Sequence, residues 1–173
     1  MAEFNPTYIL IGANSKIQIA PYGTTQGAST SVGYTQGPVV LSVEETWEDV
    51  IPDQTVGPVT GEKQEEIATL NIPMLEQSFK NIGNAYGVGE GNTAADSIEY
   101  GGATSGQFFS VWVAAPGTGS KTRTVEVYKV RPGDGAREIG IAKDGAVVMN
   151  APYRAYLDTT KSAGKQYFKI SEA

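Results

Sequence analysis

The sequence contains no histidine and no cysteine among its 173 residues. Without these side chains the chain cannot build a Ser-His-Asp or Cys-His catalytic site, nor a zinc site with imidazole or thiolate ligands. No side chain has an ordinary pKa close to neutrality, which a general base acting at pH 7 needs. Chemistry based on carboxylates, lysine or tyrosine remains open. We expect a protein that is not an enzyme and that holds no cofactor and no metal ion.

Disulfides, targeting signals and long apolar runs are also missing. Because the chain lacks cysteine, its stability must come from burial, β-ladders or oligomerisation, and a reducing cytoplasm is acceptable. Residues 1–6 contain no basic patch followed by an apolar stretch. No later apolar run approaches the ~20 residues that span a bilayer. We therefore expect neither a secreted precursor nor a membrane anchor.

The composition indicates one folded domain with many short strands. Hydrophobic residues make up 40% of the chain and charged residues 18%, a balance that argues against disorder. The length suits a single domain over residues 1–173. Glycine occurs 21 times, mainly between β-branched runs, as it does in the turns of all-β proteins.

Charge is distributed unevenly along the chain. Residues 1–120 carry a net charge of −10 and residues 121–173 a net charge of +4. The acidic first part argues against nucleic-acid binding through that part, because phosphate contacts need lysine and arginine. The complementary halves favour head-to-tail self-association, although an unequal scatter of surface charge is an equally simple interpretation.

The first part of the chain predicts a hairpin and a loop. Two β-branched runs, residues 7–11 and 17–20, flank a turn-forming cluster and predict a first hairpin. The Gly/Ser/Thr/Gln stretch 23–37 has almost no apolar content and predicts an exposed loop.

A long hairpin is predicted from residue 39 onward. On its first strand, alternation places Val39, Leu41, Val43 and Trp47 on one face and Ser42, Glu44, Thr46 and Glu48 on the other. Prolines and glycines predict a long irregular tip over residues 51–62. The returning strand places Glu66, Ala68, Leu70 and Ile72 toward the core and Glu65, Ile67, Thr69 and Asn71 away from it. The second face of the hairpin is therefore largely polar, and it meets either bulk solvent or a water-filled channel between subunits.

One helix and several further strands complete the expected fold. Pro73 suits a first helical turn, and the stripe Leu75, Phe79, Ile82 and Tyr86 predicts a helix over about 74–84 that packs on the sheet. Later strands are expected at Phe108–Ala115, Thr122–Val130, Glu138–Val148, Tyr153–Leu157 and Tyr167–Ile170. Without βαβ alternation, this order predicts a mainly β fold, an antiparallel β-sandwich or barrel with one flanking α-helix and a long hairpin loop.

Two parts of the sequence resemble a known family. The run Val39–Glu44, then Asp53–Val59, then Glu66–Pro73 and a short helix, is similar in order to the hairpin and helix of the major tail tube proteins of long-tailed bacteriophages. The segments 151–158 and 167–170 are similar to the closing strands of that family, whose fold recurs in the type VI secretion tube. Together these parts cover roughly half of the chain.

The resemblance implies a structural virion protein located in the tail and assembled in the cytoplasm of the bacterial host. It implies homohexameric rings that stack into a tail tube, a conduit for DNA ejection into the host. DNA would pass through the channel without specific binding. Tape measure, tail tip and terminator proteins would be its other partners.

Two groups of candidate residues follow from this implication. An acidic channel would repel DNA phosphates and let the genome slide. The candidates for lining that channel are Ser42, Glu44, Thr46, Glu48, Glu65, Thr69 and Asn71. The candidates for contacts between subunits lie in the tip and are Asp53, Gln54, Val56, Pro58 and Val59. Ordinary solvent is the alternative surrounding for each of these channel residues.

Competing hypotheses come from other classes of protein. A monomeric ligand-binding β-sandwich would use Trp47, Trp112 and surface tyrosines as a platform for sugars, whereas we expect both tryptophans to lie in the core. A carboxylate enzyme would need a pair such as Glu44 and Glu48, which strand geometry places about 13 Å apart, too far for glycosidase chemistry. A capsid decoration or tail-terminator protein is a closer alternative.

Overall fold

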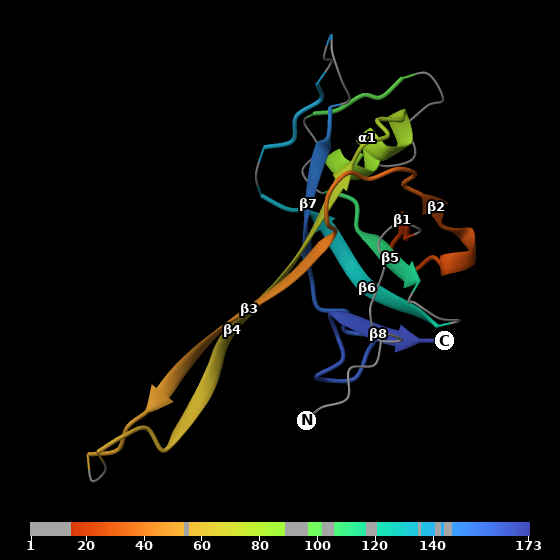
Figure 1. Cartoon of the computed structure of the whole chain (residues 1–173). Coiled ribbons are helices and arrows are strands. Elements are labelled where there is room, and N and C mark those ends of the chain that lie inside the picture. Colours follow the sequence, from red (N-terminus) through yellow and green to blue (C-terminus); the bar gives the residue numbers. More distant parts are fainter. Residues whose placement is uncertain are drawn as a thin grey trace, which may run out of the picture.

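The computed structural model describes residues 15–53, 56–88, 97–101, 106–116, 121–134, 136–140, 143 and 147–173. These residues form an eight-stranded antiparallel sheet with one α-helix beside it (Figure 1). The elements are β1 (Lys16–Pro21), a 3-10 turn η3 (Gln26–Ala28), β2 (Thr30–Ser31), β3 (Val40–Val50), β4 (Thr60–Met74), α1 (Phe79–Tyr86), β5 (Phe109–Pro116), β6 (Thr122–Pro132), β7 (Met149–Ala155) and β8 (Phe168–Glu172). The mainly β, antiparallel fold with one flanking helix is thus confirmed.

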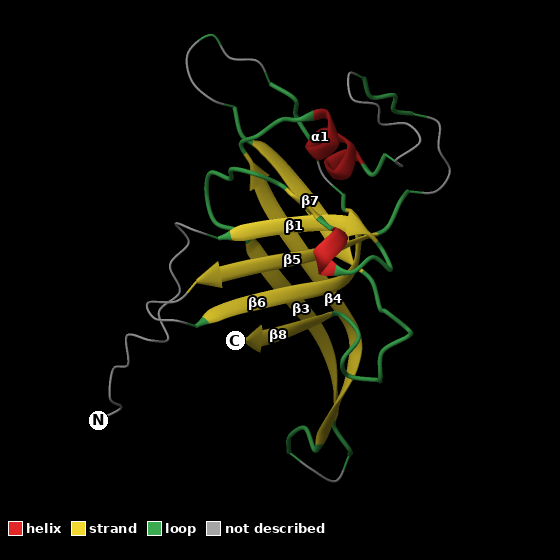
Figure 2. Cartoon of the chain, turned by 90° about the vertical axis from the view of Figure 1, so that its right-hand side faces the viewer, coloured by secondary structure: helices red, strands yellow, loops and turns green. Residues whose placement is uncertain are grey.

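Strand β6 is the branching point of the sheet. The strand order is β2-β1-β5-β6-β7-β4-β3, and β8 also pairs with β6. Along one edge of β6, residues 123–127 pair with β8 and residues 130–132 pair with β7. Figure 2 shows the result, with β1, β5, β6 and β8 in front and β3 and β4 crossing behind them. The described strands form one strongly curved sheet that ends at β2 and β3, and closure into a barrel is not seen.

The core lies on the inner face of this curved sheet. On β4 the expected alternation is confirmed, since Ala68, Leu70 and Ile72 are buried whereas Thr69 and Asn71 are exposed. Other strands contribute residues to the same cluster, among them Ile17, Ile19, Phe109, Val111, Val127, Val130, Met149 and Tyr153. Because residues of β1 and β4 share one cluster, burial of apolar side chains holds the two halves of the sheet together.

The helix begins later than the sequence predicts. Pro73 is not in a helical turn but in β4, opposite Asn150 of β7, so the strand continues to Met74. The helix starts only after Ser78, whose hydroxyl accepts a hydrogen bond from the Asn81 backbone N–H at 3.3 Å. It ends at Gly87, where a φ of 71° and the ring of Pro132 close by leave no room for a side chain.

Two further segments differ from the sequence-based expectation, and a third lies outside the described residues. The segment 23–37 is not simply an exposed loop, because it contains η3 and β2, and the Asn81 side-chain amide donates a hydrogen bond of 2.7 Å to the carbonyl of buried Val32. The strand expected at Glu138–Val148 is wrong for its described residues, which pair with no described strand, and β7 starts at Met149. The expected strand at residues 7–11 lies outside the described residues.

The core alternation on β4 gives a first testable expectation. Leu70→Ala should lower the free energy of unfolding by about 2–5 kcal/mol, because it removes a buried side chain and leaves a cavity. Thr69→Ala, one residue away on the exposed face, should change it by no more than about 0.5 kcal/mol. Urea unfolding followed by circular dichroism measures both, and equal losses would contradict the assigned faces.

Candidate functional site: the hairpin arm

The hairpin of β3 and β4 extends far beyond the rest of the sheet. Residues 69–74 of β4 pair with β7, and residues 69–71 of these also pair with β3, whereas the part from Thr60 to Ala68 pairs with β3 only among the described strands. We call residues 43–68 the arm. It projects away from the body of the molecule, and its tip lies at the end opposite α1 (Figures 1 and 2). An isolated two-stranded ribbon is only marginally stable in water.

The seven channel candidates lie on one face of the hairpin. The register pairs Ser42 with Thr69 and Thr46 with Glu65, and residues directly opposite each other share a face. Asn71 lies opposite Val40 on the same face, and Glu44 and Glu48 follow by alternation along β3. Except for half-buried Ser42, all seven candidates are exposed. Glu44 and Glu48 therefore share a face but stand a four-residue repeat apart.

The same face carries one acidic residue that the sequence did not indicate. The register shifts after Thr46, so that Trp47 pairs with Lys63 and Gln64 is left as an extra residue in β4. Simple alternation from Glu66 places Glu62 on the core side, but the bulge moves it opposite Glu48 on the polar face. A bulge in an exposed ribbon leaves no apolar pattern in the sequence, so alternation alone could not have found it.

The other face of the arm holds a compact charged cluster. Glu45 and Glu66 lie directly opposite each other, and their repulsion is relieved by Lys63, whose Nζ is 2.5 Å from one carboxylate and 3.0 Å from the other. The hydrogen bond from Lys63 lowers the pKa of Glu45, and the same bond raises the pKa of Lys63. Trp47 donates its indole N–H to Glu45 at 3.2 Å and lies under the Lys63 ammonium.

The position of Trp47 corrects an expectation. Its side chain is 55% exposed on the arm, so it is not a core residue. Trp112 is buried, with 4% of its surface exposed, but it alternates with Val111 and Val113 and so lies on the face away from the core cluster. A sugar-binding platform built from both tryptophans is excluded, because Trp112 offers no surface for stacking.

Apolar side chains gather at the tip of the arm. The Val59 N–H donates to the Val50 carbonyl at 3.0 Å, which closes the hairpin, and the irregular tip spans residues 51–59, not 51–62. Val50, Ile51, Val56 and Val59 are all exposed, and Val56 is fully so. Asp53, Val56, Pro58 and Val59 of the candidate list lie here, and Gln54 lies outside the described residues. Ile51 was not predicted as a contact residue, although an isoleucine beside Pro52 in a polar stretch indicates an exposed apolar side chain.

The arm also concentrates negative charge and an unpaired strand edge. It contains eight acidic side chains and one basic side chain, a net charge of −7. The outer edge of β3 is eleven residues long and pairs with no described strand. Long exposed edges expose N–H and C=O groups that readily pair with another chain. The arm is thus an acidic surface with apolar ends and a template for strand addition.

Basic side chains gather elsewhere, along β6 and the connection between β7 and β8. Lys129 Nζ lies 4.6 Å from the ring centre of Phe108 and 5.2 Å from that of Tyr22, and Lys161 lies 4.7 Å from that of Tyr128. These cation–π contacts keep ammonium groups over aromatic faces, near the surface. The acidic side chains of the arm and these basic side chains therefore lie in separate parts of the molecule, although the two halves of the sequence share one sheet.

Asp158 fixes the connection between β7 and β8. It is 4% exposed and accepts hydrogen bonds from Tyr22 at 2.8 Å and from the Thr160 hydroxyl and backbone N–H at 2.6 Å and 3.0 Å. Burial alone raises the pKa of Asp158, but the hydrogen bonds from Thr160 and Tyr22 outweigh it and hold the pKa below its ordinary value of 3.8.

Comparisons with known proteins add no assignment. No family model matches the sequence, and a search of curated proteins finds no match. Within the described ranges, no group of three or more acidic residues is arranged to hold a metal ion. The helix that the structure describes is too short to cross a membrane.

The carboxylate of Asp158 should make stability depend on pH. Because its pKa is depressed in the folded state, its charge contributes stability above the unfolded value, and this contribution is lost as the pH falls below about 4. Asp158→Asn keeps an acceptor but removes the charge. It should therefore be less stable than the wild type at pH 7, and the difference in free energy of unfolding should shrink toward pH 3.

Urea unfolding at a series of pH values measures this difference. Asp134→Asn is the matched control, since Asp134 is exposed and outside the Asp158 cluster. A gap between the wild type and Asp158→Asn that stays constant from pH 7 to pH 3 would refute a stabilising role of the charge.

Proposed function

We propose that this chain is a structural virion protein that self-assembles into hexameric rings stacked as the tail tube of a bacteriophage. The tube conducts DNA into the host cell, and its subunits assemble in the host cytoplasm. Tape measure, tail tip and terminator proteins are the other partners. The observation that carries the proposal is the arm, an acidic ribbon with an apolar tip, whose eleven-residue strand β3 pairs with no described strand on its outer edge. The number of six subunits comes from the resemblance of the sequence to tail tube proteins.

The free edges support assembly by strand pairing. Besides β3, strand β8 uses only one edge, because it pairs with β6 and with no other described strand. A ring in which β3 of one subunit meets a strand of the next satisfies these edges without a conformational change in the core. Contacts between different surfaces of identical subunits produce rings or filaments and not closed dimers.

The polar face of the arm supports a channel. Glu44, Glu48, Glu62 and Glu65 lie on the face that also carries Thr46, Thr69 and Asn71. In a ring of subunits, this face repeated around an axis gives a lining that is negative throughout. Such a lining repels DNA phosphates, so that a double helix slides through without being held. The function proposed here needs no catalytic residue, cofactor or metal.

The proposal predicts visible tubes and a protected strand. After prolonged incubation at high concentration, negative-stain electron microscopy should show hollow tubes of stacked rings. Hydrogen exchange of β3 amides should slow by roughly tenfold or more on assembly, because outward N–H groups gain partners. The amides of β4 at residues 69–71, already paired with both β3 and β7, serve as the internal control. Persistent monomers, or tubes with unprotected β3 amides, would count against strand pairing as the assembly mechanism.

The sign of the channel charge gives a second prediction. Tubes of the wild-type protein should not retain a short fluorescent DNA duplex in co-sedimentation at low salt. Tubes of the Glu44→Lys, Glu48→Lys variant should retain it, because the lining becomes locally basic.

The control for this experiment changes the same amount of charge elsewhere. Asp134→Lys, Glu138→Lys alters two exposed acids that lie outside the arm. If this control retains as much DNA as the arm variant, net charge explains the binding and the face does not line a channel.

A further inference from the structure

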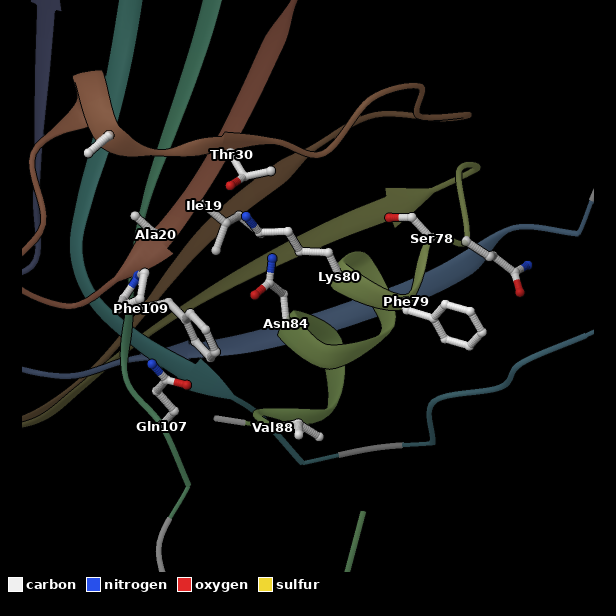
Figure 3. A pocket seen from close by; sticks show the side chains of 13 residues that line it. Ile19, Ala20, Thr30, Ser78, Phe79, Lys80, Asn84, Val88, Gln107 and Phe109 are labelled. Atoms are coloured by element: carbon white, nitrogen blue, oxygen red, sulfur yellow. The ribbon is translucent and has the colours of Figure 1, made fainter. Parts of the chain in front are cut away.

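A pocket of about 650 Å³ lies between α1 and the β1–η3–β2 part of the sheet. Its floor is apolar and comprises the buried side chains of Ile19, Ala20, Phe109 and Val88. The helix supplies one wall (Figure 3), and its residue Phe79, which also lines the pocket, is 44% exposed. The volume is in the ~300–1,000 Å³ range of sites that enclose a ligand of drug size, enough for a few aliphatic side chains.

Three polar side chains of the pocket indicate the chemistry of an occupant that would suit it. Lys80 and Asn84 extend from α1 toward β1 and Thr30 (Figure 3). Within the described residues, exposed Lys80 makes no ion pair. The side-chain oxygen Oε1 of Gln107 is buried and accepts no hydrogen bond from any described group. An occupant that suits this pocket is apolar, carries a carboxylate for Lys80 and brings an N–H donor for Gln107.

The tip of the arm has this chemistry. Its described residues include exposed Val56 and Val59 and the exposed carboxylate of Asp53, and they lie outside β3 and β4, so the backbone N–H groups of Asp53 and Val56 belong to no described ladder. Its surroundings are acidic, which suits the positive charge of Lys80. The tip and the pocket cannot meet within one molecule, because they lie at opposite ends of it (Figures 1 and 2).

We propose that the pocket beside α1 receives the arm tip of a second copy of this chain. The contact is heterologous: the tip of each copy enters the pocket of the next, so the arrangement repeats along a stack. Val56 and Val59 enter above Ile19 and Phe109, Asp53 pairs with Lys80, and a backbone N–H of the tip donates to Gln107. This inference rests on the proposed self-assembly and names the surface that joins one copy to the next along the tube.

Cysteine cross-linking tests the contact directly, because the natural chain has no cysteine to interfere. Equal amounts of Val56→Cys and Asn84→Cys proteins are mixed, assembled and oxidised. We expect a disulfide-linked dimer that contains one copy of each variant, identified by mass spectrometry of the linked peptides. Ser162→Cys replaces Asn84→Cys in the matched control, since Ser162 is exposed on the connection between β7 and β8, away from the pocket. The control pair should give at least tenfold less linked dimer.

A charge exchange tests the same contact without cysteine. Lys80→Glu should raise the critical concentration for assembly by roughly tenfold or more, since a carboxylate then faces Asp53. Adding Asp53→Lys to Lys80→Glu should restore most of the loss, which a variant that merely misfolds would not show. Circular dichroism of the monomers verifies that each variant is folded.

The outcomes separate this inference from the proposed function. Tubes without a link between positions 56 and 84, and without rescue by the charge exchange, overturn the tip contact and leave the tube proposal standing. A link from position 84 to another segment of the second copy assigns the pocket to that segment and also overturns it. If no tubes form, the mixed monomers are oxidised at high concentration instead, and absence of the 56–84 link then overturns the tip contact, whereas the absence of tubes counts separately against the proposed function.

Discussion

The continuity of β4 is the constraint on which the rest of the structure depends. Its inner part, residues 69–74, pairs with β7 throughout and with β3 at residues 69–71, and it supplies Leu70 and Ile72 to the core. Its outer part belongs to a ribbon that has only one partner strand, β3. Burial of the inner part fixes the direction of the outer part, since a strand held by neighbours on both sides leaves little freedom where it emerges. The core therefore orients the arm, although the arm contributes almost no side chains to the core.

The negative charge of the arm mainly determines which surfaces the arm can contact. The acidic side chains are held close together, and Lys63 relieves repulsion at only one point, between Glu45 and Glu66. Such a surface repels its own copies and DNA alike, and it attracts basic surfaces. Basic groups stand along β6 and at α1, outside the arm. The distribution thus favours contact between unlike surfaces of two copies over contact between like surfaces.

Much of the fold could be predicted from the sequence, because apolar alternation records burial. The spacing of Ala68, Leu70 and Ile72 gave the core face of β4 correctly. Pro73 was misassigned because a missing N–H suits both a first helical turn and a strand position whose N–H has no ladder partner, and only the pairing with β7 separates these. The Glu138–Val148 segment has β-branched residues, but its described residues pair with no described strand, and pairing is a tertiary property.

The arm could be predicted less well than the body. The face of Glu44 and Glu65 followed from alternation, but the bulge at Gln64 that adds Glu62 to it has no sequence signal. Trp47 was expected in the core because large aromatic side chains are usually buried, whereas here it lies over a ribbon with no layer behind it. Both misses have one cause: residues 43–50 of β3 and 60–65 of β4 are exposed on both faces of the ribbon, so the alternation that encodes burial is absent there.

The junction of β4 with β7 has a mechanical consequence. Six consecutive residue pairs, from Thr69 with Arg154 to Met74 with Met149, join the two antiparallel strands. Their hydrogen bonds run perpendicular to the strands, so a pull on the tip along the arm loads them in shear. In shear the bonds share the force and yield together, whereas peeling would break them one after another. The arm is anchored in the geometry that best resists tension along its own length.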